Sequence, residues 1–214
     1  MTAFLVFLVA ILVANHLVMQ TAHYRWHRGH WLLRDAFDLD AEENFPTWYS
    51  AASLLGTAAL LYIIADAKAR AADRFTRYWY VLAIGFLAMS VDEIAGLHET
   101  LNTISSTSWT YYGAALVAVI GVAYIPFLRH LAAPMRIRFV VAGMIYVGGA
   151  VGVEHATSVW LRHGHTIDSL AYNLQVAVEE GMEMAGIVVF IDSLLAYMQA
   201  GRNDDVIVPI VTEP

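Results

Sequence analysis

Six long apolar stretches, separated by short polar segments, dominate the pattern of residues along this chain. They cover 3–22, 46–66, 78–99, 110–130, 138–160 and 170–198. About 20 mainly apolar residues are enough for a helix to cross the hydrocarbon core of a bilayer. The pattern therefore predicts an all-α fold, a polytopic transmembrane helix bundle of about six spans. We expect a single domain over 1–200, followed by a flexible cytoplasmic tail over 201–214.

Local signals refine the span boundaries. Asn44 is a candidate N-cap for the second span, and Pro46 falls in its first turn, where a missing N–H costs little. Pro126 is expected to kink or end the fourth span. Gly148 and Gly152 form a G-x-x-x-G pair, a spacing that permits close approach of two helices. The tryptophans fall near predicted span ends, as is typical of the membrane–water interface: Trp26, Trp31, Trp48, Trp79, Trp109 and Trp160.

The distribution of Lys and Arg predicts how the spans are oriented. Cytoplasmic loops carry an excess of these residues, and here they concentrate after the second and fourth spans, within 67–77 and 129–138. Both termini are then inside (N-in/C-in), and the expected location is the inner (plasma) membrane. The segment 23–45 departs from the rule, because it is predicted to lie outside yet carries three arginines.

Composition excludes several classes of function. The chain is 59% hydrophobic and 14% charged, against about 25% charged residues in a soluble domain, so a lipid bilayer is the expected environment. It contains no cysteine, which excludes disulfides, thiolate metal sites and Cys nucleophiles. A net charge of −7 argues against a nucleic-acid partner. Other membrane subunits or a second copy of the chain remain candidate partners.

Acidic and histidine side chains inside the apolar stretches are the candidate chemistry. Such groups are costly in a membrane and usually mark function. On the predicted topology they gather toward the outer end of four helices, the arrangement that builds metal sites in helix bundles. The candidate ligands are Glu43, Asp92, His98, Glu99, Glu154, His155, Glu179 and Glu183. Glu93 and Glu180 remain as a candidate catalytic acid or base. Carboxylate and imidazole donors suit iron, manganese or zinc.

The spacing of these residues limits which of them can meet. Glu179 and Glu183 are four residues apart and share a helix face. Adjacent pairs such as Asp92–Glu93 are expected to send only one member to a common centre. The absence of any E-x-x-H pair weakens a match to soluble di-iron bundles. Two alternatives to metal binding stay open: a carboxylate network that handles protons or cations, and structural polar packing.

A second polar feature follows the first span, where His16, Gln20, His23, His27 and His30 recur at near-helical intervals. If the helix continued beyond the membrane, the histidines would form one stripe, a candidate surface for metal entry or proton relay. The favoured interpretation is an interfacial segment, because HYRWHRGHW mixes aromatic and basic residues as headgroup-level belts do.

Two strings occur together, LDAEENFPTWYS at 39–50 and SVDEIAGLHETL at 90–101. They resemble a family of small, uncharacterised bacterial multi-pass membrane proteins with acid-Asn-x-Pro-Thr-Trp and Ser-x-Asp-Glu…Leu-His-Glu motifs. The resemblance implies no activity. It singles out Glu43, Asn44, Pro46, Trp48, Asp92, Glu93, His98 and Glu99. A weaker likeness is to membrane hydrolases of the alkaline ceramidase type, but the H-x-x-x-H expected in their last span is missing here.

Three functions follow as hypotheses. The first is a membrane metalloenzyme, an oxidoreductase or hydrolase that acts on a lipid or another apolar substrate. The second is a non-catalytic subunit of a larger respiratory or photosynthetic membrane complex. The third is a proton or cation transporter, against which stand the one-sided placement of the acids and the lack of a visible inverted repeat.

Overall fold

The computed structural model describes residues 1–97 and 108–203, without the side chains of the last two. The candidate ligands His98 and Glu99 lie outside the described residues, as does most of the predicted tail. Within these ranges the chain is helical and forms no strand. The elements are α1 (Thr2–Trp26), α2 (Trp31–Ala36), α3 (Phe45–Arg70), α4 (Thr76–Ala95), α6 (Trp109–His130), α7 (Ala133–Val147), the π-helix η1 (Gly148–Val153), α8 (Glu154–Arg162) and α9 (Leu170–Asn203).

The described residues contain six helical segments long and apolar enough to cross a membrane. The fifth of them, Ala133–Arg162, joins α7, η1 and α8 into one continuous span. These segments coincide with the six apolar stretches, so the predicted all-α membrane bundle is confirmed. The short helix α2 was not predicted, because its six residues are too few to show a periodic pattern.

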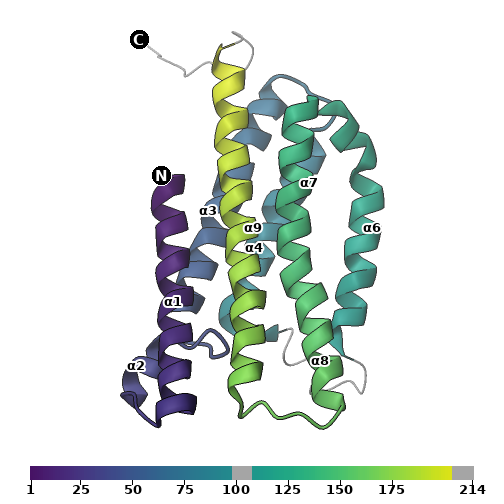
Figure 1. The fold of residues 1–214 in the computed structure, drawn as a ribbon. Coiled ribbons are helices and arrows are strands. Elements are labelled where there is room, and N and C mark those ends of the chain that lie inside the picture. Colours follow the sequence, from purple (N-terminus) through teal and green to yellow (C-terminus); the bar gives the residue numbers. More distant parts are fainter. Residues whose placement is uncertain (98–107, 204–214) are drawn as a thin grey trace.

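The long helices run side by side, and α9 is the one that most of the others touch (Figure 1). It contacts α1, α3, α7, η1 and α8. The turns from α1 to α2 and from α8 to α9 lie together at one end of the bundle, which we call the loop end (Figure 1). The C-terminal part of α9 lies at the opposite end. On the predicted orientation, the loop end is the outer one.

The start of α3 follows the predicted capping pattern. The side-chain oxygen of Asn44 accepts a hydrogen bond from the Thr47 N–H at 3.2 Å, and Pro46 sits in the first turn. The amide nitrogen of Asn44 donates to the carbonyls of Asp38 at 2.6 Å and Ala41 at 2.9 Å. One residue therefore caps a helix and fastens the preceding loop. By contrast, Pro126 does not end α6, which continues to His130.

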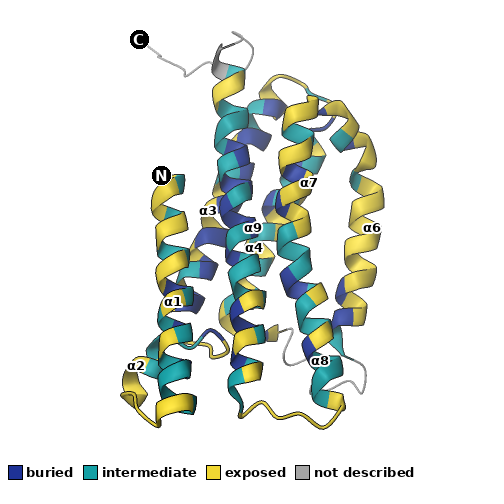
Figure 2. Cartoon of the chain, in the orientation of Figure 1, coloured by how far each residue is buried: buried dark blue, intermediate teal, exposed yellow. Residues whose placement is uncertain are grey.

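The largest apolar cluster fills the bundle away from the loop end. Trp79 and Phe127 are each only 1% exposed at its centre, with their rings edge to face and their centroids 4.9 Å apart. Trp79 was expected at the membrane interface; it is a core residue instead, held by α6, α7 and α9. Figure 2 shows the complementary pattern, with exposed residues along the outward faces of α1 and α6, as lipid-facing helices require.

Close helix approach occurs between α9 and the region where α7 meets η1. A Cβ added at Gly149 would lie 2.6 Å from the backbone oxygen of Glu179, and one at Gly186 would lie 2.7 Å from the backbone nitrogen of Tyr146. Gly148 meets the Met182 side chain, but Gly152 has open space around it. The small residues therefore do allow tight packing, although not through the predicted Gly148/Gly152 pair.

Candidate functional site

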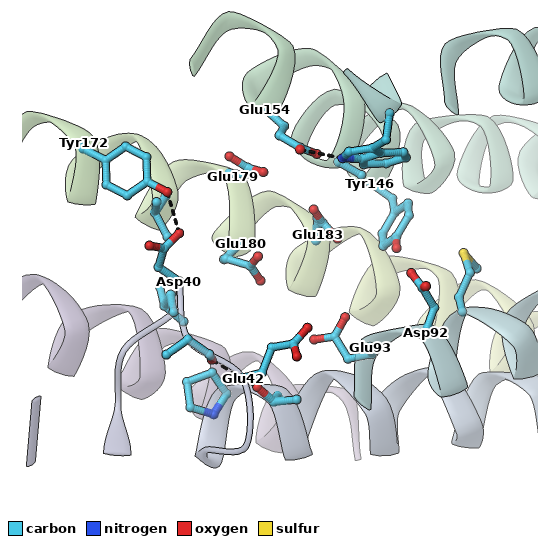
Figure 3. A pocket seen from close by; sticks show the side chains of 18 residues that line it. Asp40, Glu42, Asp92, Glu93, Tyr146, Glu154, Tyr172, Glu179, Glu180 and Glu183 are labelled. Carbon is cyan, nitrogen blue, oxygen red and sulfur yellow. Dashed lines mark hydrogen bonds between the residues drawn. The ribbon is translucent and has the colours of Figure 1, made fainter. Parts of the chain in front are cut away.

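A cavity of about 440 Å³ lies near the loop end of the bundle. Its walls come from the loop at 39–42 and from α3, α4, α6, α7, α8 and α9. Eight of its lining side chains are carboxylic acids, which Figure 3 shows around one space: Asp40, Glu42, Asp92, Glu93, Glu154, Glu179, Glu180 and Glu183. No Lys, Arg or His of the described residues lines this carboxylate pocket.

Helix α9 supplies Glu179, Glu180 and Glu183. The predicted sharing of a face by Glu179 and Glu183 is confirmed. Glu179 and Glu180 both line the pocket, as do Asp92 and Glu93, whereas of the pair Glu154 and His155 only Glu154 does. That an adjacent pair sends only one member to a common centre stays a prediction. Successive helical side chains diverge by about 100°, and this cavity is wide enough to receive them from two directions.

The π-helix η1 explains how Tyr146 and Glu154 reach the same pocket. Tyr146, Ala150 and Glu154 all line it, at intervals of four residues. In a regular α-helix the first and last would diverge by about 80°. A π-helix makes i→i+5 hydrogen bonds and turns less per residue, so residues four apart stay aligned through Gly148–Val153. π-Helical turns occur often at functional sites.

The loop that carries Asp40 and Glu42 is anchored by His16 of α1, which is only 1% exposed. One ring nitrogen of His16 accepts the Leu39 N–H at 3.1 Å, and the other is 3.2 Å from the Asn173 carbonyl. His16 therefore ties the loop to both α1 and α9. Tyr172 adds a second tie to α9, because its hydroxyl donates to Asp40 at 2.7 Å (Figure 3).

Asp38 completes this anchor. Its carboxylate accepts a hydrogen bond from Gln20 at 3.1 Å and one from the Asp40 N–H at 3.2 Å, and it lies 3.4 Å from His16. Partial burial acts to raise the pKa of Asp38, but these polar neighbours outweigh it and hold the pKa below the usual aspartate value. The ionised carboxylate therefore stabilises the loop.

Glu42 enters the pocket beside the end of α4. Gly96 follows that helix with φ +56°, a left-handed conformation that favours glycine. A Cβ at this position would also lie 2.6 Å from the Glu42 carboxylate oxygen. Gly96 thus serves two purposes: it ends α4 with a left-handed turn and it leaves the volume that Glu42 occupies.

Several pocket acids contact polar side chains on other helices. The Trp109 indole N–H donates to Glu154, and the Tyr146 hydroxyl interacts with Glu183. Within the described part of the chain, no hydrogen bond or ion pair joins Glu179 or Glu180 to another side chain. Both are only partly exposed and project into the cavity (Figure 3). Glu179 and Glu180 thus face a space that no cationic group of the described residues lines.

The structure separates the predicted site residues into two groups. Those that line the pocket are Asp92, Glu93, Glu154, Glu179, Glu180 and Glu183. Glu43 is exposed and does not line it. His155 turns away, with Nδ1 3.1 Å from the Thr110 hydroxyl and its ring against Tyr111.

The sequence did not single out Asp40, Glu42, Trp109 or Tyr146 as site residues, although all of them line the pocket. The alternation of acids at 38, 40 and 42 was a signal for the loop, although only the fold shows which of them turn inward. The histidine stripe, which was the alternative to an interfacial segment, does not form. Helix α1 ends at Trp26, and His27 is the residue that stops it.

No group of three or more His, Asp or Glu side chains stands in a ready metal-binding arrangement among the described residues. The pocket acids point into one space, but they do not close around a single point. The donors they offer are almost all carboxylate oxygens, with the Tyr146 and Tyr172 hydroxyls beside them.

The fold and the pocket define a multi-pass membrane helix bundle with a carboxylate-lined cavity toward one end. Over residues 4–198 the chain matches the model of a family described as a domain of unknown function, DUF8692, and it belongs to that family. It has no match among curated proteins and none among solved structures.

Proposed function

We propose that the carboxylate pocket binds a divalent cation within the membrane. The observation that carries this proposal is that Glu179 and Glu180 project into a cavity shared with six further acids, and no basic residue of the described chain lines it. Two like charges 4 Å apart repel by about 4 kcal/mol at an effective dielectric constant near 20. A cation removes this cost for several carboxylates at once, which favours its retention.

The donor set indicates which cations fit. Oxygen ligands suit manganese, magnesium and calcium, whereas imidazole suits zinc and iron better. Since His155 faces away from the cavity, manganese is the best supported member of the iron, manganese and zinc set. Glutamate side chains are long enough for Glu42, Glu180 and Glu183 to move toward a bound ion by rotation alone.

The position of the cavity favours a bound ion over a conduit. The half of the bundle away from the loop end is packed by an apolar cluster around Trp79 and Phe127. An ion that enters from the loop end would meet this cluster at the end of its path. Such an ion could polarise a substrate that reaches the cavity. Glu93 or Glu180, whichever does not bind the ion, would then accept or donate a proton there.

The test is elemental analysis of mildly purified full-length protein, followed by titration of the chelator-treated protein with Mn²⁺, Mg²⁺, Ca²⁺ and Zn²⁺. We expect stoichiometric binding with manganese among the preferred ions. Glu180→Gln and Glu183→Gln should each weaken binding about tenfold or more, because each removes a charged ligand.

Glu42→Gln and Glu43→Gln form a matched control pair. The two residues are adjacent and the changes are identical, but only Glu42 lines the pocket. Glu42→Gln should weaken ion binding, and Glu43→Gln should leave it unchanged. The proposal fails if the protein binds none of the four ions stoichiometrically, or if both variants lose binding equally.

A further inference from the structure

The segment 23–34 is basic in an otherwise acidic chain. It carries Arg25, Arg28 and Arg34 together with three histidines, and it contains no Asp or Glu. The whole chain has a net charge of −7. No residue of this segment lines the carboxylate pocket. The positive-inside rule does not account for three arginines on the predicted outer side.

The backbone folds this segment back on itself. His27 ends α1 in a left-handed conformation, φ 50°, while its N–H donates to the His23 carbonyl at 3.1 Å. The Arg28 N–H closes the turn onto the Ala22 carbonyl at 3.0 Å. Gly29 then adopts φ +132°, which L side chains rarely adopt. The reversal brings α2 back beside the last turns of α1.

A second cavity, of about 230 Å³, lies inside this reversal. It is lined by Met19, His23, Gly29, His30, Trp31 and Arg34. The polar side chains among them are two imidazoles and a guanidinium, and no acid of the described chain lines the cavity. Among the described residues, the Arg34 side chain has a long ion-pair contact, from Nε to Asp35 at 3.9 Å. Its two terminal nitrogens form the fork that binds phosphate oxygens in pairs.

Large apolar side chains surround this basic pocket and point outward. Trp31 is 66% exposed, and Leu32 and Leu33 beside it are 55% and 48% exposed. Trp26, at the end of α1, is 64% exposed. A short helix with exposed apolar residues next to basic groups is typical of a segment lying at the membrane surface. Acyl chains can cover the exposed apolar side chains while a phospholipid headgroup reaches the basic groups.

We propose that this basic pocket binds the phosphate of an anionic phospholipid headgroup. Arg34, His23 and His30 would contact the phosphate oxygens, and Trp31 with the adjoining leucines would pack on the glycerol and the upper acyl chains. A phospholipid contacts both the basic groups and the apolar side chains of the site, whereas free phosphate contacts only the basic groups. The same proposal gives Arg34 a role in a segment that the charge distribution places on the outer side.

Native mass spectrometry of the full-length protein in mixed micelles tests this proposal, with phosphatidylglycerol and phosphatidylcholine in equal amounts. We expect preferential retention of phosphatidylglycerol. Arg34→Gln should lower that preference about tenfold, because a charge-assisted contact to phosphate is lost. His30→Gln should lower it by a smaller factor. Arg162→Gln removes the same charge from an exposed site at the end of α8, outside the pocket, and should change nothing.

Three results would overturn the proposal. The protein could show no preference for phosphatidylglycerol. Arg162→Gln could reduce the preference as much as Arg34→Gln, which would indicate diffuse surface charge. Inorganic phosphate could displace the lipid completely, which would make the site an anion site without lipid specificity. Helix content by circular dichroism checks each variant, and if Arg34→Gln does not fold, His30→Gln decides.

Discussion

Single buried polar residues decide which acids enter the carboxylate pocket. His16, the first of the histidines spaced along the end of α1, is an internal anchor that holds Leu39 and Asn173 together. Glu43 was expected at the site, but φ 64° at this residue turns it outward while Glu42 points inward. The spans could be predicted because hydropathy is a property of many residues together. Which of Glu42 and Glu43 enters the pocket could not be predicted, because hydropathy and helical periodicity do not define the backbone torsions of a loop.

The depressed pKa of Asp38 predicts a dependence of stability on pH. Because folding favours its ionised form, this carboxylate contributes stability above its unfolded pKa and loses that contribution as the pH falls below about 3.8, the usual aspartate value. Asp38→Asn should lower the melting temperature at pH 7, and the gap to the natural protein should shrink as the pH falls through this range.

Asp35→Asn is the control for this prediction. Asp35 lies in the same segment with its side chain 57% exposed, and its replacement should alter the melting temperature little at any pH. Thermal unfolding in detergent, followed by circular dichroism from pH 7 to pH 3, gives both comparisons. A gap between the natural protein and Asp38→Asn that stays constant with pH would contradict the role assigned to the charge.

At the scale of elements, the contact of α9 with η1 sets the geometry of the pocket. The predicted pair of close-approach glycines was Gly148 and Gly152, but the close backbone contact is at Gly149, and Gly152 has open space around it. The π-helical turn could not be foreseen, because GGAVGV carries no signature for i→i+5 bonding. Such a turn forms where packing against a neighbour compensates for the altered hydrogen bonds.

Gly149→Ala should separate the two helices. The new methyl group would meet the backbone oxygen of Glu179 at 2.6 Å, and a backbone atom cannot rotate away. We expect a loss of about 1–3 kcal/mol of stability and weaker binding of Mn²⁺, since Glu179 and Glu183 would shift with α9. Chemical unfolding and ion titration measure the two effects.

Gly143→Ala is the matched change in the same span, at a position with no atom within 4 Å of the added methyl group. It should leave stability equal or slightly higher, because alanine favours a helix more than glycine does. If the two alanine variants behave alike, the close approach of α9 and η1 does not set the pocket geometry.

The helix bundle has two halves, which differ in the side chains that they enclose. Around Trp79 and Phe127 the helices are joined by apolar and aromatic packing, whereas toward the loop end they enclose a cavity lined by acids. Composition and periodicity predicted the bundle and the one-sided placement of its acids. They could not predict that the loop at 39–42 folds in to complete the cavity, since this depends on contacts of Asp38 and Asp40 with helices distant in sequence.

The two halves should respond oppositely to substitution. Trp79→Ala opens a void in the apolar cluster and should cost about 3 kcal/mol or more of stability, while the folded fraction keeps its full ratio of bound ion to protein. Glu180→Gln should abolish or weaken ion binding with little loss of stability in the ion-free protein. Unfolding curves and elemental analysis of both variants check this. Loss of ion from folded Trp79→Ala protein would show that the halves are coupled.

The central position of α9 also has a consequence for biogenesis. This helix follows all the other described spans in the chain, so α1 to α8 leave the ribosome before Glu179, Glu180 and Glu183 exist. Until then Asp92, Glu93 and Glu154 have no helix to close their side of the cavity. A segment with three acids enters a bilayer poorly by itself. We therefore expect the earlier spans to leave an open groove in the membrane, and the last helix to insert against it.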